Sequence, residues 1–197
     1  KRWLNGSFLL QKMKSDTRIL NIGTASYMFA TVYVETGVRN FSPSTVEIRG
    51  KHNEKENYMK QGYFGRGWIQ LTHKDKYKIA SDILKIDLLG NPDLALEKDI
   101  SYEILFNGMN RGWIEKYRST EGGGAGEISI KLGDFVSDSD NNYGQARAVI
   151  NANCRKIIVD GKRKCRNPNK LYKGKGFLPS EEDLDAAGIA AQVARKF

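Results

Sequence analysis

Residues 62–72, with the sequence Gly-Tyr-Phe-Gly-Arg-Gly-Trp-Ile-Gln-Leu-Thr, constrain the backbone of this 197-residue chain more than any other stretch. Three glycines fall within six positions, so the backbone can turn tightly and approach another group closely. The stretch also carries flat aromatic faces and hydrogen-bonding side chains, which together suit a sugar ring. These side chains are Tyr63, Phe64, Arg66, Trp68, Gln70 and Thr72. When this stretch is considered without its flanking sequence, a glycine-rich turn that leads into an ordinary core segment explains it as well as a sugar-binding site does.

The composition indicates a folded chain with a strong positive charge. Lysine and arginine number 32 against 23 acidic residues, a formal net charge of +9, and 40% of the residues are apolar. The length fits one ordinary domain, so we predict a single, monomeric domain over residues 1–197. The charge predicts attraction to polyanions, namely nucleic acid, anionic lipid or a wall bearing carboxylates and phosphates. The alternative is a basic protein whose charge serves only solubility.

The chain shows neither a membrane-spanning run nor a secretory signal. No apolar run approaches the ~20 residues that cross a bilayer, and residues 1–5 do not resemble a signal peptide. Because the chain does not begin with Met, we expect a processed product or a domain cut from a longer protein. Its two cysteines, Cys154 and Cys165, form neither a disulfide framework nor a metal site, and a local bridge and a reduced state are both open.

Residues 25–35 predict a helix that is buried on nearly every side. Almost every position is apolar or small, Thr24 can cap the start, and Gly37 suits a left-handed cap at the end. Glu35 is the one charged residue of this helix and lies in its last turn.

The position of Glu35 is unfavourable for a negative charge. Carbonyl groups at the helix C-terminus repel the charge, and burial disfavours ionisation, so both effects favour the protonated acid. A general acid in catalysis needs this protonated form. The alternative is a structural ion pair with an arginine such as Arg39 or Arg66.

The alternation of residues 45–49 predicts a strand, followed by a polar turn over residues 50–57 and a return toward the glycine-rich stretch. We therefore expect a small β-hairpin or sheet. Glu47 lies on the strand and is positioned by it, whereas Glu54 and Glu56 lie at the tip, where charges are usually solvated. We prefer Glu47 to the tip residues as a second catalytic carboxylate.

Most of the remaining chain predicts helices. Helical spacing of apolar residues marks residues 73–89, 97–118 and 142–151, and residues 179–183 resemble the start of a C-terminal helix. The predicted fold class is α+β and mostly α-helical.

Three motifs in the same order give the chain a family resemblance. Residues 34–37, Val-Glu-Thr-Gly, resemble a helix end that usually reads His-Glu-Thr-Gly. Residues 64–73 are similar to a Gly-Arg-Gly signature in which Pro commonly stands in place of Trp68, and residues 87–94 resemble Leu-Leu-x-Asn-Pro-Asp-Leu. Together they resemble glycoside hydrolase family 19, the chitinases and phage or bacterial endolysins of the lysozyme-like superfamily. Residues 24–114 carry the resemblance.

The resemblance implies a lysozyme-like fold with a small hairpin or sheet beside an active-site cleft. It makes Glu35 the general acid, and Glu47 best fits the family's second glutamate, although the interval between them is shorter than usual. Lys76 stands where the family often has a substrate-contacting Asn. The predicted substrate-binding residues are five aromatic or polar residues of the glycine-rich stretch and one residue outside it. They are Tyr63, Arg66, Trp68, Gln70, Thr72 and Asn151.

The implied reaction is hydrolysis of a β-1,4 glycosidic bond with inversion. One carboxylic acid protonates the leaving oxygen and one carboxylate activates water, with the two groups roughly 6.5–9.5 Å apart. No metal or cofactor is expected. A lytic transglycosylase, which needs no second carboxylate, is a competing interpretation. A non-enzymatic module that binds walls or nucleic acid is another, although the chain shows no specific nucleic-acid motif.

For the substrate, the charge favours peptidoglycan over chitin, because a basic surface suits an anionic wall. The chain also lacks the many cysteines that are usual in secreted plant chitinases. The sequence therefore predicts a bacteriolytic endolysin or muramidase that acts on the bacterial cell wall, from the host cytoplasm before lysis, from a phage particle or after secretion. A chitinase acting on N-acetylglucosamine polymers is the alternative.

Overall fold

The computed structural model describes residues 2–36, 41–47, 57–112, 116–119, 126–129, 131–137, 146, 149–150, 156–159 and 162–165. The chain divides into two compact units. The first unit comprises Lys1–Ser15 and Val32–Gly108, and the second comprises Asp16–Thr31 and Met109–Phe197. The expectation of a single domain stays a prediction.

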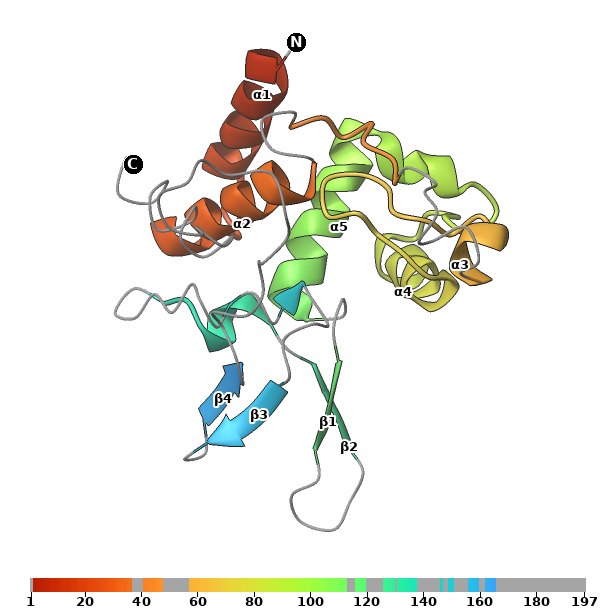
Figure 1. The fold of residues 1–197 in the computed structure, drawn as a ribbon. Coiled ribbons are helices and arrows are strands. Elements are labelled where there is room, and N and C mark those ends of the chain that lie inside the picture. Colours follow the sequence, from red (N-terminus) through yellow and green to blue (C-terminus); the bar gives the residue numbers. More distant parts are fainter. Residues whose placement is uncertain are drawn as a thin grey trace, which may run out of the picture. The chain divides into compact units, whose positions relative to one another are not determined.

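The prediction of a mostly helical chain is confirmed (Figure 1). The helices are α1 (Arg2–Ser15), α2 (Ile22–Glu35), α3 (Asn57–Lys60), α4 (Lys74–Leu84) and α5 (Lys98–Arg111), with a 3₁₀-helix η1 at Pro92–Leu96. Helix α2 begins in the second unit and ends in the first.

Helix α1 packs on the glycine-rich stretch and on α5 through a few side chains. Leu9 is fully buried, and the Phe8 ring lies 6.1 Å from the Trp68 ring between centroids. At the surface, Lys12 forms a salt bridge of 2.6 Å with Asp99. The apolar face therefore holds α1 in the first unit, since an exposed ion pair adds ~1 kcal/mol at most.

Helix α2 is buried along most of its length, as its composition predicts. The fully or nearly fully buried side chains are those of Tyr27, Met28, Ala30, Thr31 and Val32. The predicted cap is wrong: Asn21, not Thr24, caps the helix, because the Asn21 side-chain oxygen accepts a hydrogen bond of 2.7 Å from the Thr24 N–H. Glu35 is the last helical residue, as expected, and Gly37 lies outside the described residues.

The hairpin predicted beside the cleft is wrong in its returning strand. Residues Asn57–Lys60 form the single-turn helix α3, closed by a hydrogen bond from the Gln61 N–H to the Asn57 carbonyl at 3.0 Å. The helical turn buries Met59, which is 1% exposed. The predicted tip, with Glu54 and Glu56, lies outside the described residues.

Residues 41–47 join the glycine-rich stretch by one isolated bridge and not by a regular strand, and a second bridge lies within the glycine-rich stretch itself. Isolated antiparallel bridges pair Val46 with Arg66 and Arg66 with Leu71. Within these described residues the pairing does not extend beyond isolated bridges. The tight turn at Gly67 reverses the backbone directly after the first bridge.

Two helices end earlier than predicted. Helix α4 stops at Leu84 because Lys85 takes a left-handed conformation, with φ of 59°, and its N–H donates to the Ser81 carbonyl. Helix α5 stops at Arg111, where Gly112 has a φ of 71°. A left-handed residue directly after a helix is a common C-terminal cap.

The second unit contains two short antiparallel pairs of strands that were not predicted (Figure 1). Strand β1 (Lys116–Ser119) pairs with β2 (Gly126–Ser129), and β3 (Lys156–Val159) pairs with β4 (Lys162–Cys165). A 3₁₀-helix η3 at Leu132–Asp134 lies between the pairs in sequence.

Several predictions fall on residues that the structure does not describe. Most of the predicted helix over residues 142–151 and all of the predicted C-terminal helix lie outside the described residues, as does Cys154. Within the described helices, none combines the length and the apolar character that crossing a membrane requires.

Candidate active site

The glycine-rich stretch forms a tight reversal of the backbone. Arg66 and Leu71 exchange backbone hydrogen bonds of 3.2 and 2.9 Å across the turn. Gly67, with φ of 76°, faces the Ala95 carbonyl and Ser101, so that a Cβ added to it would lie 2.6 Å from the carbonyl oxygen and 2.7 Å from the Ser101 hydroxyl. Glycine is required here both by the backbone angle and by the space.

Arg66 supports this turn from inside and does not present its charge to a ligand. The side chain is 6% exposed, and its Nε donates to Asp93 at 2.8 Å. Its Nη1 donates to the Gly62 carbonyl at 2.8 Å and to the Tyr77 hydroxyl at 3.1 Å, and its guanidinium lies 3.8 Å from the centroid of the Phe64 ring. The predicted substrate contact at Arg66 is corrected to a structural role.

Trp68 is likewise a core residue. Its side chain is 0% exposed, and the indole N–H donates to the Phe41 carbonyl at 3.0 Å. The predicted sugar contact at Trp68 is therefore corrected, because neither face of the buried ring is open. The sequence alone did not decide this, because a tryptophan beside glycines can either stack on a sugar ring or pack in the hydrophobic core.

Glu47 is fixed in place by three hydrogen bonds. Its backbone N–H donates to the Gly65 carbonyl at 2.8 Å, and the Gly65 N–H donates back to Oε2 at 2.9 Å. The Tyr58 hydroxyl donates to Oε1 at 3.0 Å. Both carboxylate oxygens thus have a donor, which fixes the orientation of the group.

Tyr58 was not singled out by the sequence. A tyrosine between a polar turn and a glycine-rich stretch carries no pattern that links it to a carboxylate 11 residues earlier. Only the one-turn helix α3 brings the hydroxyl to Glu47, because it turns Met59 into the core and leaves Tyr58 half-buried beside the turn.

Glu35 ends helix α2 and is half-buried. The residue that follows it is firmly held: the Thr36 hydroxyl donates to the Val32 carbonyl at 2.7 Å and accepts from the Phe41 N–H at 3.1 Å. Glu35 and Glu47 belong to the same compact unit. Each of these two carboxyl groups therefore lies on, or directly beside, a backbone segment that is held by hydrogen bonds.

The other predicted contact residues lie half-buried around this turn. Gln70 has an unusual φ of 52°, and its Nε2 donates to the carbonyls of Thr45 and Gly67 at 3.1 and 2.9 Å. The Thr72 hydroxyl donates to the Gln70 carbonyl at 2.6 Å, and the Tyr63 hydroxyl donates to the Leu89 carbonyl at 3.3 Å. A left-handed non-glycine residue is strained, which is typical of functional turns.

The predicted contact at Asn151 lies outside the described residues, as does Arg39, one of the two arginines considered as a partner of Glu35. The other, Arg66, forms its ion pair with Asp93.

Tyr77 is buried, and its hydroxyl group forms hydrogen bonds with the glycine-rich turn. Its hydroxyl donates to the Phe64 carbonyl at 2.9 Å and accepts from Arg66. Burial raises the pKa of Tyr77 to about 12, although the Arg66 guanidinium opposes the shift.

This pKa predicts alkaline destabilisation of the fold. Between the ordinary value of 10.0 and about 12 the folded Tyr77 keeps a proton that the unfolded chain has lost. The stabilisation is therefore complete below pH 10 and declines as the pH rises toward 12. We expect urea midpoints measured from pH 8 to 11.5 to fall more steeply for the wild type than for Tyr77→Phe, and parallel curves would contradict this assignment.

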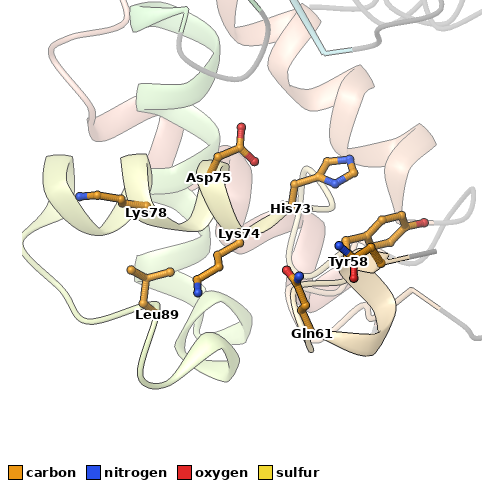
Figure 2. A pocket seen from close by; sticks show the side chains of 8 residues that line it. Tyr58, Gln61, His73, Lys74, Asp75, Lys78 and Leu89 are labelled. Atoms are coloured by element: carbon orange, nitrogen blue, oxygen red, sulfur yellow. The ribbon is translucent and has the colours of Figure 1, made fainter.

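A cavity of about 580 Å³ lies between α3 and the start of α4 (Figure 2). Its lining residues are Asn57, Tyr58, Gln61, His73, Lys74, Asp75, Lys78 and Leu89. Tyr58 is shared, since it lines the cavity and donates to Glu47. Among the described residues, no group of three or more His, Cys, Asp or Glu side chains could hold a metal ion.

A sequence model of the glycoside hydrolase family 19, described as chitinase class I, matches residues 19–119. The match covers just over half of the chain and contains Glu35, Glu47 and the whole glycine-rich turn. The chain belongs to this family. The resemblance inferred from the motifs is thereby confirmed.

Curated relatives share short stretches with this family member. Chitinase 11 of Oryza sativa subsp. japonica is 62% identical over 33 residues, which are 17% of this chain and 13% of the relative. An acidic endochitinase of Petunia hybrida is 44% identical over 48 residues, 24% of this chain and 19% of the relative. The chain thus matches less than a fifth of the length of these relatives, and no solved structure matches it significantly.

Proposed function

We propose that this member of family 19 is a glycoside hydrolase that cleaves β-1,4 bonds between N-acetylglucosamine units, with Glu35 as general acid and Glu47 as general base. The observation that carries the proposal is the fixed Glu47 carboxylate, with the Tyr58 hydroxyl on one oxygen and the Gly65 N–H on the other. A structural glutamate at the surface has no need of two donors, whereas a base must be oriented toward its water.

The two carboxyl groups have environments that suit different roles. Glu47 receives a hydrogen bond on each oxygen, which orients the carboxylate that is to take a proton from water. Glu35 is the half-buried last residue of helix α2, so a long helix carries the group that is to donate a proton. One carboxyl group to donate a proton and one oriented carboxylate to activate water are the two groups that inverting hydrolysis requires.

In the proposed reaction Glu35 donates its proton to the oxygen of the leaving sugar. Glu47 takes a proton from a water molecule, whose oxygen forms the new bond to the anomeric carbon from the opposite face. The anomeric configuration is inverted. The two glutamates exchange one proton each with substrate and water, and solvent restores both.

Chitin is the first candidate substrate, which changes the order given by the sequence analysis. The relatives are named as chitinases, and their identity to this chain reaches 62% over the stretch they share. Peptidoglycan remains the second candidate because the net charge of +9 favours an anionic wall. Both polymers contain β-1,4-linked N-acetylated sugars, so the proposed chemistry is the same.

Product analysis on both polymers tests the proposal. Wild-type protein is incubated with chitin hexaose and with purified peptidoglycan, and the products are identified by mass spectrometry. We expect hydrolysed fragments with reducing ends from the chitin oligomer. Anhydro-sugar products would indicate a lytic transglycosylase, and no cleavage of either polymer by the folded chain would leave a binding module.

Tyr58→Phe tests the positioning of Glu47. Loss of the hydroxyl removes one of the two donors to the carboxylate, and a hydrogen bond to a charged group contributes ~1.5–3 kcal/mol. We expect kcat to fall roughly tenfold or more while KM changes little. An unchanged kcat would mean that the Gly65 N–H alone orients the base.

A further inference from the structure

The cavity between α3 and the start of α4 carries a positive charge that neutral chitin does not require. Lys74 is the first residue of α4, is exposed, and places its ammonium group 5.8 Å from the centroid of the Tyr63 ring. Figure 2 shows the Lys74 side chain extending between Leu89 and Gln61. In the described part of the chain no carboxylate pairs with this ammonium group.

The other charged groups of the cavity are engaged or point elsewhere. The Lys78 ammonium lies 2.8 Å from the Asp82 carboxylate, four residues along α4. In Figure 2 the Asp75 carboxylate points away from the space that Lys74 enters. Lys74 is therefore the cation that a ligand in this cavity would meet, with the Gln61 amide as a neighbouring hydrogen-bonding group.

The cavity is linked to the catalytic base through one side chain. Tyr58 lines it, donates to Glu47, and packs edge-on against the His73 ring with 4.7 Å between centroids. A substituent of the sugar chain bound in the cavity would thus reach the tyrosine that holds the proposed base. The volume of about 580 Å³ is within the range of small-molecule sites.

We propose that this cavity is a subsite for a carboxylate substituent on the glycan, with Lys74 as the group that recognises it. The inference rests on the proposed glycosidase and favours the second of its two candidate substrates, the acidic glycan of peptidoglycan, over neutral chitin. A neutral N-acetylglucosamine offers the ammonium group only uncharged acceptors, whereas a sugar bearing a lactyl ether or a peptide offers a carboxylate. An ion pair at a solvent-accessible site changes affinity by up to about fivefold.

Binding of two matched tetrasaccharides tests the subsite. One contains only N-acetylglucosamine, and the other alternates N-acetylglucosamine with N-acetylmuramic acid, whose lactyl ether supplies the carboxylate. Dissociation constants are measured by calorimetry with the full chain carrying Glu35→Gln, so that neither ligand is consumed. We expect this parent to bind the acidic ligand about three- to fivefold more tightly, with a preference that shrinks as salt is raised.

Three further variants in the same background separate a local contact from general charge. Lys74→Gln should abolish the preference and Lys74→Arg should retain it. Lys60→Gln removes the same charge from an exposed position on α3 that does not line the cavity, and the preference should remain. A preference that persists in Lys74→Gln, or that is absent from the parent, would overturn the subsite.

Turnover by the wild type distinguishes this failure from failure of the proposed function. Lack of hydrolysis of both ligands would refute the glycosidase, and the dissociation constants would still decide whether Lys74 recognises the carboxylate. Hydrolysis of both ligands without a Lys74-dependent preference would keep the glycosidase and remove the subsite.

Discussion

Replacement of Glu35 by Gln should lower kcat on chitin oligosaccharides by roughly 10²- to 10⁴-fold, the usual contribution of a general acid. The amide has nearly the shape of the acid and keeps a hydrogen-bond donor, but it cannot deliver a proton to the leaving oxygen. KM should change little, because the proton moves only as the bond breaks. Initial rates at saturating substrate measure the effect.

Glu97→Gln is the matched control for this variant. Glu97 is exposed, follows the 3₁₀-helix η1 and takes no part in the proposed chemistry, so its variant should keep wild-type rates. A Glu35→Gln chain with rates within a few-fold of the control would remove Glu35 from the mechanism.

Gly67→Ala should be the most destabilising small substitution in the glycine-rich turn. The new Cβ would lie 2.6 Å from the Ala95 carbonyl oxygen, and φ is 76°, where an L-residue is strained. Backbone strain contributes ~1–2 kcal/mol and forced repacking ~1–3 kcal/mol. We expect a loss of about 2–5 kcal/mol in the free energy of unfolding, measured by urea denaturation.

Gly62→Ala separates these two contributions. Gly62 has a similar φ of 82°, but no atom lies within 4 Å of an added Cβ. This variant should lose only the ~1–2 kcal/mol of backbone strain. Equal losses at both glycines would show that packing against Ala95 and Ser101 contributes nothing.

The sequence was sufficient for helices α2, α4 and α5 and for the position of Glu35 at the end of α2. Those predictions depended on periodic apolar residues over many positions, a signal that packing reinforces. The return of the chain after residue 50 could not be predicted in the same way. Four residues, Asn57–Lys60, carry no periodicity, and whether they form a strand or a turn of helix depends on where Met59 can be buried.

In the glycine-rich turn the chemical character of each residue was clear from the sequence, but its role was not. Arg66 and Trp68 have the chemistry of sugar-binding residues, yet both are directed inward, where Asp93 and the Phe41 carbonyl satisfy their donors. Glu47 was identified from its place in the chain, whereas its partner Tyr58 depends on a tertiary contact that no local pattern encodes.

The anomeric form of the first product tests most directly the claim that Glu35 and Glu47 act as an acid and base pair. Chitin hexaose is mixed with the wild-type protein, and proton NMR spectra are recorded before the new reducing ends equilibrate. Inversion of a β-linked substrate predicts the α-anomer as the initial product. The β-anomer would instead require a retaining mechanism and would contradict the role of Glu47 as the base that activates water.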